Sequence, residues 1–143
     1  MGAFKEPHGG VLKERYLGES AADDEKRKAQ DYRSWDLTER QLCDIELILN
    51  GAFSPLEGFL TRREYQSVLE TMRLTSGLLW PIPITLDVDP KFAEGLEPAE
   101  TIALRDREGV IIATMSIEDI WTPDKTAEAV AVFGTSDQAH PGV

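Results

Sequence analysis

Residues 50–59 are the stretch that most restricts how this chain can fold. The run reads Asn-Gly-Ala-Phe-Ser-Pro-Leu-Glu-Gly-Phe. Glycines permit backbone conformations that a side chain disfavours, and Pro55 fixes its own φ while moving the preceding serine away from the helical region. Burial of a large apolar side chain contributes about 1.5–3 kcal/mol. The run has three of them: Phe53, Leu56 and Phe59. We predict a shaped corner, with both phenylalanines largely buried and Gly51 or Gly58 in a conformation that favours glycine.

Capping boxes predict a helix on each side of this corner. Upstream, Thr38 is followed three residues later by Gln41, and downstream Thr61 is followed by Glu64. In such a box the two side chains bond the free backbone N–H groups of the first turn. Apolar residues then recur at helical spacing. They are Leu42, Ile45, Ile48 and Leu49 in the first helix, and Tyr65, Val68, Leu69 and Met72 in the second. Cys43 lies beside the first apolar face, so we expect a buried or half-buried packing residue.

From residue 79 the apolar residues recur with a period of two. The even-numbered positions are apolar and two of the odd-numbered ones are proline, which predicts a strand over residues 82–88 with its even-numbered side chains in the core. Proline cannot donate to a ladder, so this strand should lie at a sheet edge or a barrel mouth. Residues 101–105 and 110–117 flank a short polar loop that contains Gly109. That arrangement predicts an antiparallel pair of strands.

Two further helices are indicated by capping residues and composition. Residues 20–31 are rich in alanine, lysine and glutamate, with Ser20 as the expected N-cap of a surface helix. Thr122 and Pro123 are typical of an N-cap and a first helical position, and this helix should run to Phe133. Taken from the residues alone, the chain is an α+β domain with a small antiparallel sheet or barrel.

Composition restricts the class of protein. A chain of 143 residues fits one domain that buries about 68% of its unfolded surface. The formal net charge of −11 opposes phosphate backbones and anionic membranes, so we expect neither a nucleic acid nor a membrane as partner. Cys43 is the single cysteine, which excludes an internal disulfide and suits a reducing compartment. With no long apolar run and no apolar signal core, the expected location is the cytoplasm.

Few residues are candidates for a chemical role, and each can also be explained as a structural or surface residue. His8 could be a ligand or a base, but it has no neighbouring ligand pattern, and Cys43 has no visible base. Residues 26–28 are basic and could hold a phosphate, yet an equal number of acids precedes them. Arg62 and Arg63 could reach an anion or serve solubility. No phosphate-binding glycine loop or nucleophile elbow is present. We therefore assign no catalytic, cofactor-binding or metal-binding residue to this chain.

Five blocks of the sequence, in order, resemble the N-terminal region of the ATP sulfurylases, also called sulfate adenylyltransferases. They are Pro-His-Gly-Gly at 7–10; Leu-Thr at 37–38 with Gln-Leu-Cys-Asp-Ile-Glu at 41–46; the corner at 50–59; Trp-Pro-Ile-Pro-Ile-Thr-Leu-Asp at 80–87; and Val-Phe-Gly-Thr at 132–135 with His-Pro-Gly-Val at 140–143. The corner is the most specific block, because a generic connection between helices does not need this string of residues. The resemblance covers nearly the whole chain.

The resemblance implies a PUA-like pseudo-barrel of mixed or antiparallel strands with flanking helices. Residues 1–143 would form that single domain, and the catalytic nucleotidyltransferase domain would follow residue 143. In the family, sulfate attacks the α-phosphorus of Mg-ATP and gives adenosine 5′-phosphosulfate and pyrophosphate. The motifs that hold these substrates, Gln-x-Arg-Asn and His-x-x-His, are absent here, where the histidines are His8 and His140. The implied role is to support the catalytic domain of the same enzyme, with homo-oligomerisation in the parent and no activity alone.

An alternative from another class is a free-standing PUA-like module that binds RNA or a small ligand. An RNA-binding face should be basic and should carry aromatic side chains on which bases stack. The net charge of −11 and an aromatic content of 8% favour the enzyme domain. Whether the parent enzyme also carries an adenylylsulfate kinase domain is left open by the sequence.

Overall fold

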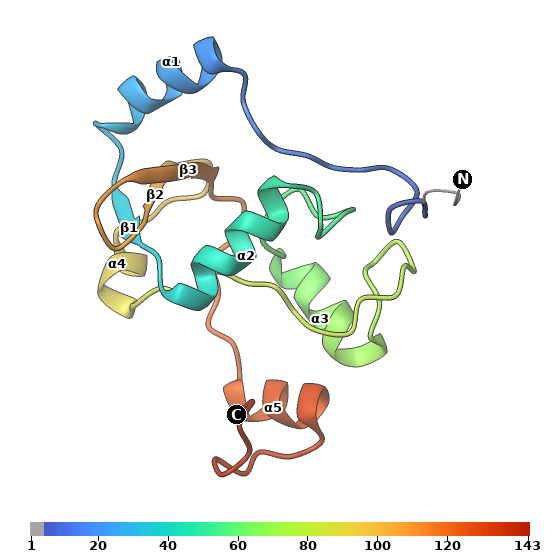
Figure 1. Ribbon diagram of the computed structural model, residues 1–143. Helices are drawn as coiled ribbons and strands as arrows, with labels where there is room; N and C mark the ends of the chain where they lie inside the picture. Colours follow the sequence, from blue (N-terminus) through green and yellow to red (C-terminus); the bar gives the residue numbers. More distant parts are fainter. Residues whose placement is uncertain (1–4) are drawn as a thin grey trace. The chain divides into compact units, whose positions relative to one another are not determined.

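The computed structural model describes residues 5–143, and Figure 1 shows its helices and strands. In chain order they are α1 (Glu19–Ala29), β1 (Ser34–Asp36), α2 (Glu39–Leu49), α3 (Arg62–Thr71), α4 (Pro90–Glu94), β2 (Thr101–Arg105), β3 (Ile111–Ser116) and α5 (Lys125–Phe133). The chain divides into two compact units. Among the described residues, unit 1 consists of 5–59 and Leu86–Glu118, and unit 2 of Leu60–Thr85 and Asp119–Val143.

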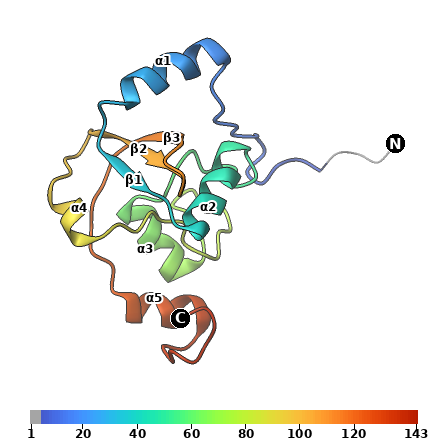
Figure 2. The ribbon, with the colours of Figure 1, turned by 60° about the vertical axis from the view of Figure 1, so that its left-hand side comes forward.

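Unit 1 is built on a small mixed sheet with the strand order β1-β2-β3 (Figure 2). Strand β1 is parallel to β2, with Trp35 opposite Leu104, and β2 is antiparallel to β3, with Ile102 opposite Met115. The predicted antiparallel pair and the α+β class are therefore confirmed. The sheet is open, because β1 and β3 each have a second strand on one side only within the described residues. The pseudo-barrel that the resemblance implied is not confirmed.

The core of unit 1 lies between this sheet and α2. Strand β2 is central in the sheet and buries three successive residues, Ile102, Ala103 and Leu104. Helix α2 contributes the apolar face expected from its sequence. The buried cluster consists of Leu37, Ile45, Ile102, Leu104 and Ile117, and Leu42, Leu49, Phe59 and Met115 are among the half-buried residues that pack on it. A β-strand buried on both faces and a helix buried on one face thus make one core.

Helix α2 begins with the predicted capping box. The Thr38 hydroxyl accepts a hydrogen bond from the Gln41 backbone N–H, and the Gln41 side chain accepts one from the Thr38 N–H. Gln41 is buried and does more than cap: its Oε1 also accepts from Trp35 Nε1 at 3.0 Å, and its Nε2 donates to the Asp87 carbonyl at 2.6 Å. One side chain therefore joins the start of α2 to β1 and to the segment after residue 85.

Helix α1 is tied to β3 by one carboxylate. Glu25 Oε1 accepts hydrogen bonds from Tyr32 Oη at 3.4 Å and from Thr114 Oγ1 at 3.1 Å. The expected start of this helix is corrected, because its N-cap is Gly18 and not Ser20, and Gly18 has no side chain with which to cap. Ser20 lies in the first turn instead.

Unit 2 pairs α3 with α5. Its buried residues are Leu60, Tyr65, Val68, Leu74, Trp80, Ile84 and Ala129. Thr61 caps α3 by accepting from the Glu64 N–H at 3.5 Å. The expected return bond is replaced, because the Glu64 carboxylate accepts from the backbone N–H and the hydroxyl of Thr75. Met72 was expected on the apolar face, but it is the left-handed C-cap of α3, with φ 55°, and is 51% exposed.

The predicted strand over residues 82–88 is wrong. No strand forms there, and the expected alternation fails because Ile82 is 48% exposed while Ile84 is 7% exposed. The Ile84 carbonyl accepts from the Leu60 N–H at 2.9 Å, which fixes this one position without a ladder. Pro81 and Pro83 lack the N–H groups that a ladder needs, which limits the pairing that this extended run can make.

The start of α5 also differs by two residues from the expectation. Asp124 is the N-cap, and its carboxylate accepts from the Ala127 N–H at 3.0 Å. Thr122 and Pro123 therefore precede the helix. The predicted end is confirmed, since α5 stops at Phe133 and Gly134 follows in the left-handed conformation with φ 73°.

Candidate functional site

The corner, residues 50–59, joins the end of α2 to the start of α3 and is shaped as its sequence requires. Gly51 has φ 81°, which confirms the glycine prediction. The burial prediction is corrected. Phe53 and Phe59 are half-buried, whereas Ser54 and Leu56 are buried, at 2% and 8% exposure. The serine, which the sequence suggested only as a neighbour of proline, is therefore a buried polar residue of this corner.

The Ser54 hydroxyl connects the corner to an N-terminal arm, residues 5–17. It donates to the Gly51 carbonyl at 2.6 Å and accepts from the Lys13 backbone N–H at 2.8 Å. Two residues further along the arm, the Arg15 N–H donates to the Leu49 carbonyl at 2.9 Å. The arm therefore satisfies the buried hydroxyl and one of the carbonyls that α2 leaves free at its end.

The arm also packs closely on the corner. A Cβ atom placed on Gly51 would lie 2.7 Å from Leu12 Cδ1, so the absence of a side chain lets the arm approach. Glu57 Oε1 faces the cations of Lys13 at 3.5 Å and Arg15 at 3.7 Å. All three side chains are well exposed, so each of these ion pairs contributes at most about 1 kcal/mol.

The chemistry of the corner is structural. A nucleophilic serine needs a base that takes its proton. The Ser54 hydroxyl instead donates to a backbone carbonyl and is enclosed at 2% exposure. No electrophile could reach it without displacing the arm. The corner therefore anchors the arm and the end of α2.

The residues considered for chemistry lie apart within unit 1. His8 is exposed in the arm, and residues 26–28 are exposed on α1, where Arg27 pairs with Asp24. In unit 2, Arg62 and Arg63 are exposed in the first turn of α3. The structure does not assemble these cations into an anion-binding cluster within either unit.

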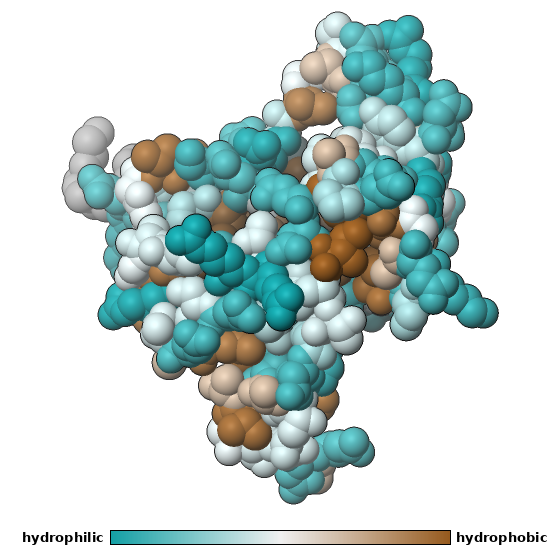
Figure 3. All heavy atoms as spheres, turned by 180° about the vertical axis from the view of Figure 1, so that it is seen from behind, coloured by the Kyte–Doolittle hydropathy of each residue, from teal (hydrophilic) through white to brown (hydrophobic). Residues whose placement is uncertain are grey.

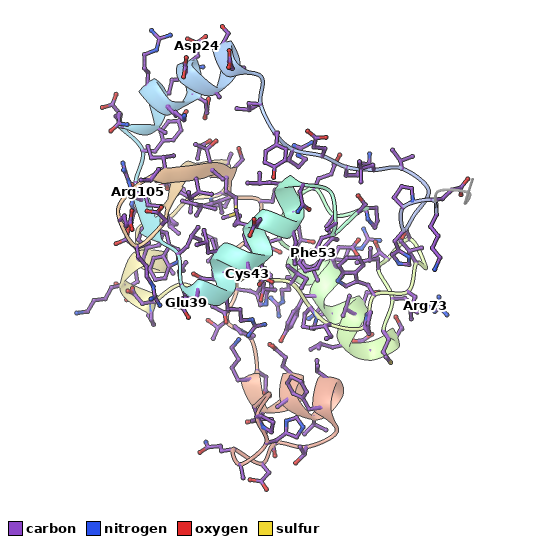
Figure 4. The ribbon with its side chains drawn as sticks, viewed as in Figure 1. Asp24, Glu39, Cys43, Phe53, Arg73 and Arg105 are labelled. Atoms are coloured by element: carbon purple, nitrogen blue, oxygen red, sulfur yellow. The ribbon has the colours of Figure 1, made fainter. Side chains whose placement is uncertain are left out.

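The expectation for Cys43 is corrected, because its side chain is exposed on α2 (Figure 4). The buried residues of α2 are Gln41, Ile45 and Ile48. Successive helical residues are turned by about 100°, so Cys43, two positions from Gln41 and from Ile45, points away from both. It is a surface thiol and not a packing residue.

Two titratable groups have perturbed pKa values. Partial burial raises the pKa of the Asp44 carboxyl, and the charge of Arg40 opposes this effect. Desolvation, followed by the charge of Glu25, raises the pKa of Tyr32. Over residues 5–143, no three or more His, Cys, Asp or Glu side chains are grouped so that they could hold a metal ion. In the same part of the chain, every helix is too short or too polar to cross a membrane.

One polar contact in unit 2 was not predicted from the sequence. Tyr65 Oη donates to Glu128 Oε2 at 2.6 Å, and the ring of Tyr65 lies 5.6 Å from that of Trp121. The Trp121 Nε1–H is buried without a hydrogen-bond acceptor among the described residues. Tyr65 and Glu128 are separated by 63 positions in the sequence, so no local motif could indicate that they meet.

Comparison with known proteins gives concordant results. The PUA-like domain family matches residues 5–143. The sulfate adenylyltransferase of Eremothecium gossypii is 50% identical over 96% of this chain and 27% of its own length, and that of Saccharomyces cerevisiae is 46% identical with the same coverage. A solved structure described as a hexameric APS kinase from Thiobacillus denitrificans has a TM-score of 0.75 and 35% identity, over 84% of this chain and 24% of that one. The chain thus spans about a quarter of the length of these proteins.

Proposed function

Because this chain belongs to the PUA-like domain family and is homologous to the N-terminal part of the sulfate adenylyltransferases, we propose that it is the supporting domain of such an enzyme and inactive by itself. The observation that carries this proposal is the unequal coverage. The similarity extends over 96% of the chain but 27% of the Eremothecium gossypii relative. Most of the relative therefore lies outside the matched part. The family resemblance implies that the motifs that hold the substrates lie there too.

The arrangement of cations supports inactivity. Transfer of a phosphoryl-type group depends on positioned cations around the charge that develops in the transition state. Arg105 in unit 1 donates to Ser34 Oγ and the Gly109 carbonyl, and Arg73 in unit 2 donates to the Gly77 carbonyl. These guanidinium groups hold the fold together. We therefore assign Mg-ATP and sulfate to residues outside the matched part of the enzyme.

The partner of this domain is the catalytic part of the same enzyme. Homo-oligomerisation of the parent is supported by the hexameric description of the structural neighbour. We also propose that the enzyme is located in the cytoplasm. We further propose that segments outside the three-stranded sheet complete a pseudo-barrel. Sulfate activation is the reaction to which the domain contributes, through support and not through contact with the reacting atoms.

An assay of two proteins tests the proposal. The first is this chain. The second is a chimera in which residues 5–143 replace the matched part of the Eremothecium gossypii enzyme. With magnesium, ATP, sulfate and pyrophosphatase, the chain should form no adenosine 5′-phosphosulfate above background, and the chimera should form it. Turnover by the purified chain would overturn the assignment of inactivity. A folded chimera without activity would count against the assignment of this chain to that enzyme.

A further inference from the structure

The chain has a single asparagine, Asn50, and a glycine follows it at the end of α2. In such a pair the backbone nitrogen of the glycine can attack the side-chain amide carbon Cγ of the asparagine, because glycine has no side chain to obstruct the approach. Asparagine is for this reason one of the thermolabile residues of proteins. Asn50 is exposed, so water and hydroxide, the co-reactants of this chemistry, have access to its amide.

The folded chain holds this pair in a conformation that opposes the attack. Asn50 is the C-cap of α2 with ψ −1°, which eclipses the Gly51 nitrogen with the Asn50 nitrogen and turns it away from Cβ and Cγ. Asn50 Oδ1 accepts from the Ala52 N–H at 2.9 Å, and the Gly51 N–H donates to the Ile48 carbonyl at 3.3 Å. Both reacting groups are therefore engaged elsewhere, and the peptide between them must rotate before a ring can close.

The N-terminal arm lies over Gly51 and restricts this rotation. Gly51 is buried, and a Cβ atom built on it would lie 2.7 Å from Leu12 Cδ1 and 3.4 Å from the Glu14 backbone nitrogen. The Ser54 hydroxyl joins the two segments, because it accepts from the Lys13 N–H and donates to the Gly51 carbonyl. The peptide of Gly51 therefore cannot turn freely while the arm is in place.

The arm itself buries little apolar surface. Figure 3 shows hydrophobic residues at the molecular surface in brown, and the exposed ones of the chain include Val11 at 59%, Leu12 at 55%, and Tyr16 and Leu17 at 57% each. A segment that buries little apolar surface opens at a lower free energy than the core does. Release of the arm is thus an easier route to a mobile Gly51 than unfolding of the whole unit.

We propose that Asn50 is a site of spontaneous deamidation and that release of the arm controls its rate. Once the peptide has rotated, hydroxide removes the Gly51 N–H proton and the nitrogen forms a bond to Asn50 Cγ. The bond from Cγ to the amide nitrogen breaks, and that nitrogen takes a proton from water and leaves as ammonia. Water then opens the cyclic imide at one of its two carbonyls and gives aspartate or isoaspartate. The sum is one water consumed and one ammonia released, with no oxidation or reduction.

Either product is unfavourable at this place in the fold. The new carboxylate lies at the C-terminal end of α2, where the helix dipole disfavours negative charge and the last turn has no basic residue to offset it. Isoaspartate also lengthens the backbone by one methylene immediately before Gly51, whose φ is 81°. The modification should therefore weaken the junction to which the arm is attached.

Mass spectrometry of the chain after incubation at mildly alkaline pH tests this proposal. Tryptic peptide 41–62 contains the single asparagine, and deamidation replaces its NH₂ group by OH with a measurable gain in mass. A synthetic peptide of the same sequence gives the rate without the fold, and the folded chain should react at least about tenfold more slowly. Fragmentation of the peptide locates the change, and Asn50→Gln should abolish it.

Two variants release the arm and one control does not. Ser54→Ala removes the hydroxyl that joins the arm to the corner and should accelerate deamidation of the folded chain at least about fivefold. Leu12→Ala clears the space over Gly51, keeps the backbone hydrogen bonds, and should also accelerate it. The control is Ile102→Val, at a buried position of β2, which lowers the stability of the unit 1 core and should leave the rate unchanged.

Three results would overturn the inference. Equal rates in the folded chain and the synthetic peptide would show that the fold does not restrain the pair. If Ile102→Val accelerated the reaction as much as Ser54→Ala, deamidation would follow unfolding of the unit and not release of the arm. No mass gain in either the chain or the peptide would remove Asn50 as a modification site. None of these measurements depends on the enzymatic activity proposed above.

Discussion

Ser54 contributes to this fold through both of its hydrogen-bonding capacities. Its hydroxyl donates to Gly51 and accepts from the backbone of Lys13, and only 2% of the residue is exposed. A buried donor that loses its acceptor retains the full cost of its desolvation. Without the Ser54 hydroxyl, the half-buried Lys13 N–H would lose its acceptor.

Replacement of this serine should be costly for its size. Ser54→Ala should lower the free energy of unfolding by about 1–3 kcal/mol, because it leaves the Lys13 N–H without its acceptor. Urea denaturation measures the loss. The control is Ser136→Ala, at an exposed position, which should stay within about 0.5 kcal/mol. Equal values for the two variants would show that the arm is not held by this hydroxyl.

Asp44 should produce a pH-dependent effect. Burial raises its pKa above the ordinary value of 3.8, so the folded state binds the proton more tightly than the unfolded state does. The stability that this group contributes is present below the unfolded pKa and is lost as pH rises through the folded pKa. Asp44→Asn removes this dependence. The unfolding free energy of the variant minus that of the parent should become more positive between about pH 3 and about pH 7. A constant difference would contradict the raised pKa.

At the scale of elements, the junction between α2 and the corner depends on one glycine. Gly51 combines φ 81° with a contact that a Cβ would make at 2.7 Å from Leu12. Gly58, in the same corner, has no atom within 4 Å of a Cβ built on it, and its φ lies outside the glycine-favouring range. Alanine at Gly58 therefore shows the effect of an added methyl group alone, and alanine at Gly51 shows in addition the effect of losing a glycine that the turn requires.

Gly51→Ala should destabilise the chain by at least about 1–2 kcal/mol, which is the cost of a left-handed conformation for a residue with a side chain. Gly58→Ala should have no cost or a small gain, because alanine reduces the freedom of the unfolded chain. Thermal unfolding of the two variants gives the comparison. If Gly58→Ala were the more harmful of the two, the assignment of the turn to Gly51 would be wrong.

At the scale of the whole molecule, charge favours an enzyme domain over an RNA-binding module. Non-specific binding of RNA depends on cations that displace the counterions of the phosphates. The chain has 15 basic and 26 acidic residues, and in unit 1 Lys13, Arg15 and Arg27 already lie beside carboxylates.

Fluorescence anisotropy with a labelled single-stranded RNA should therefore show no binding at about 10 µM protein and about 150 mM salt. A basic RNA-binding protein of similar size provides the positive control for the probe. Saturable binding that weakens as salt increases would contradict the enzyme-domain assignment and favour the free-standing module.

Features that depend on neighbouring residues could be predicted from the amino-acid sequence. The Thr38–Gln41 capping box, the turn at Gly51, the end of α5 and the antiparallel strands around Gly109 all join groups a few positions apart, so local patterns report them. The five ordered blocks of resemblance likewise indicate the family, because each block is a run of residues close together in the chain.

Features whose partners are distant in the chain depend on tertiary packing and could not be predicted in this way. Ser54 meets Lys13 across 41 positions, and Gln41 meets Asp87 across 46. An extended run becomes a strand only where another strand supplies its hydrogen bonds, so the pattern of residues 82–88 could not show that it lies outside the sheet. The exposure of Cys43 depends on which side of α2 meets the sheet. The parallel pairing of β1 with β2 joins residues far apart in the chain, such as Trp35 and Leu104, so no local pattern could indicate it.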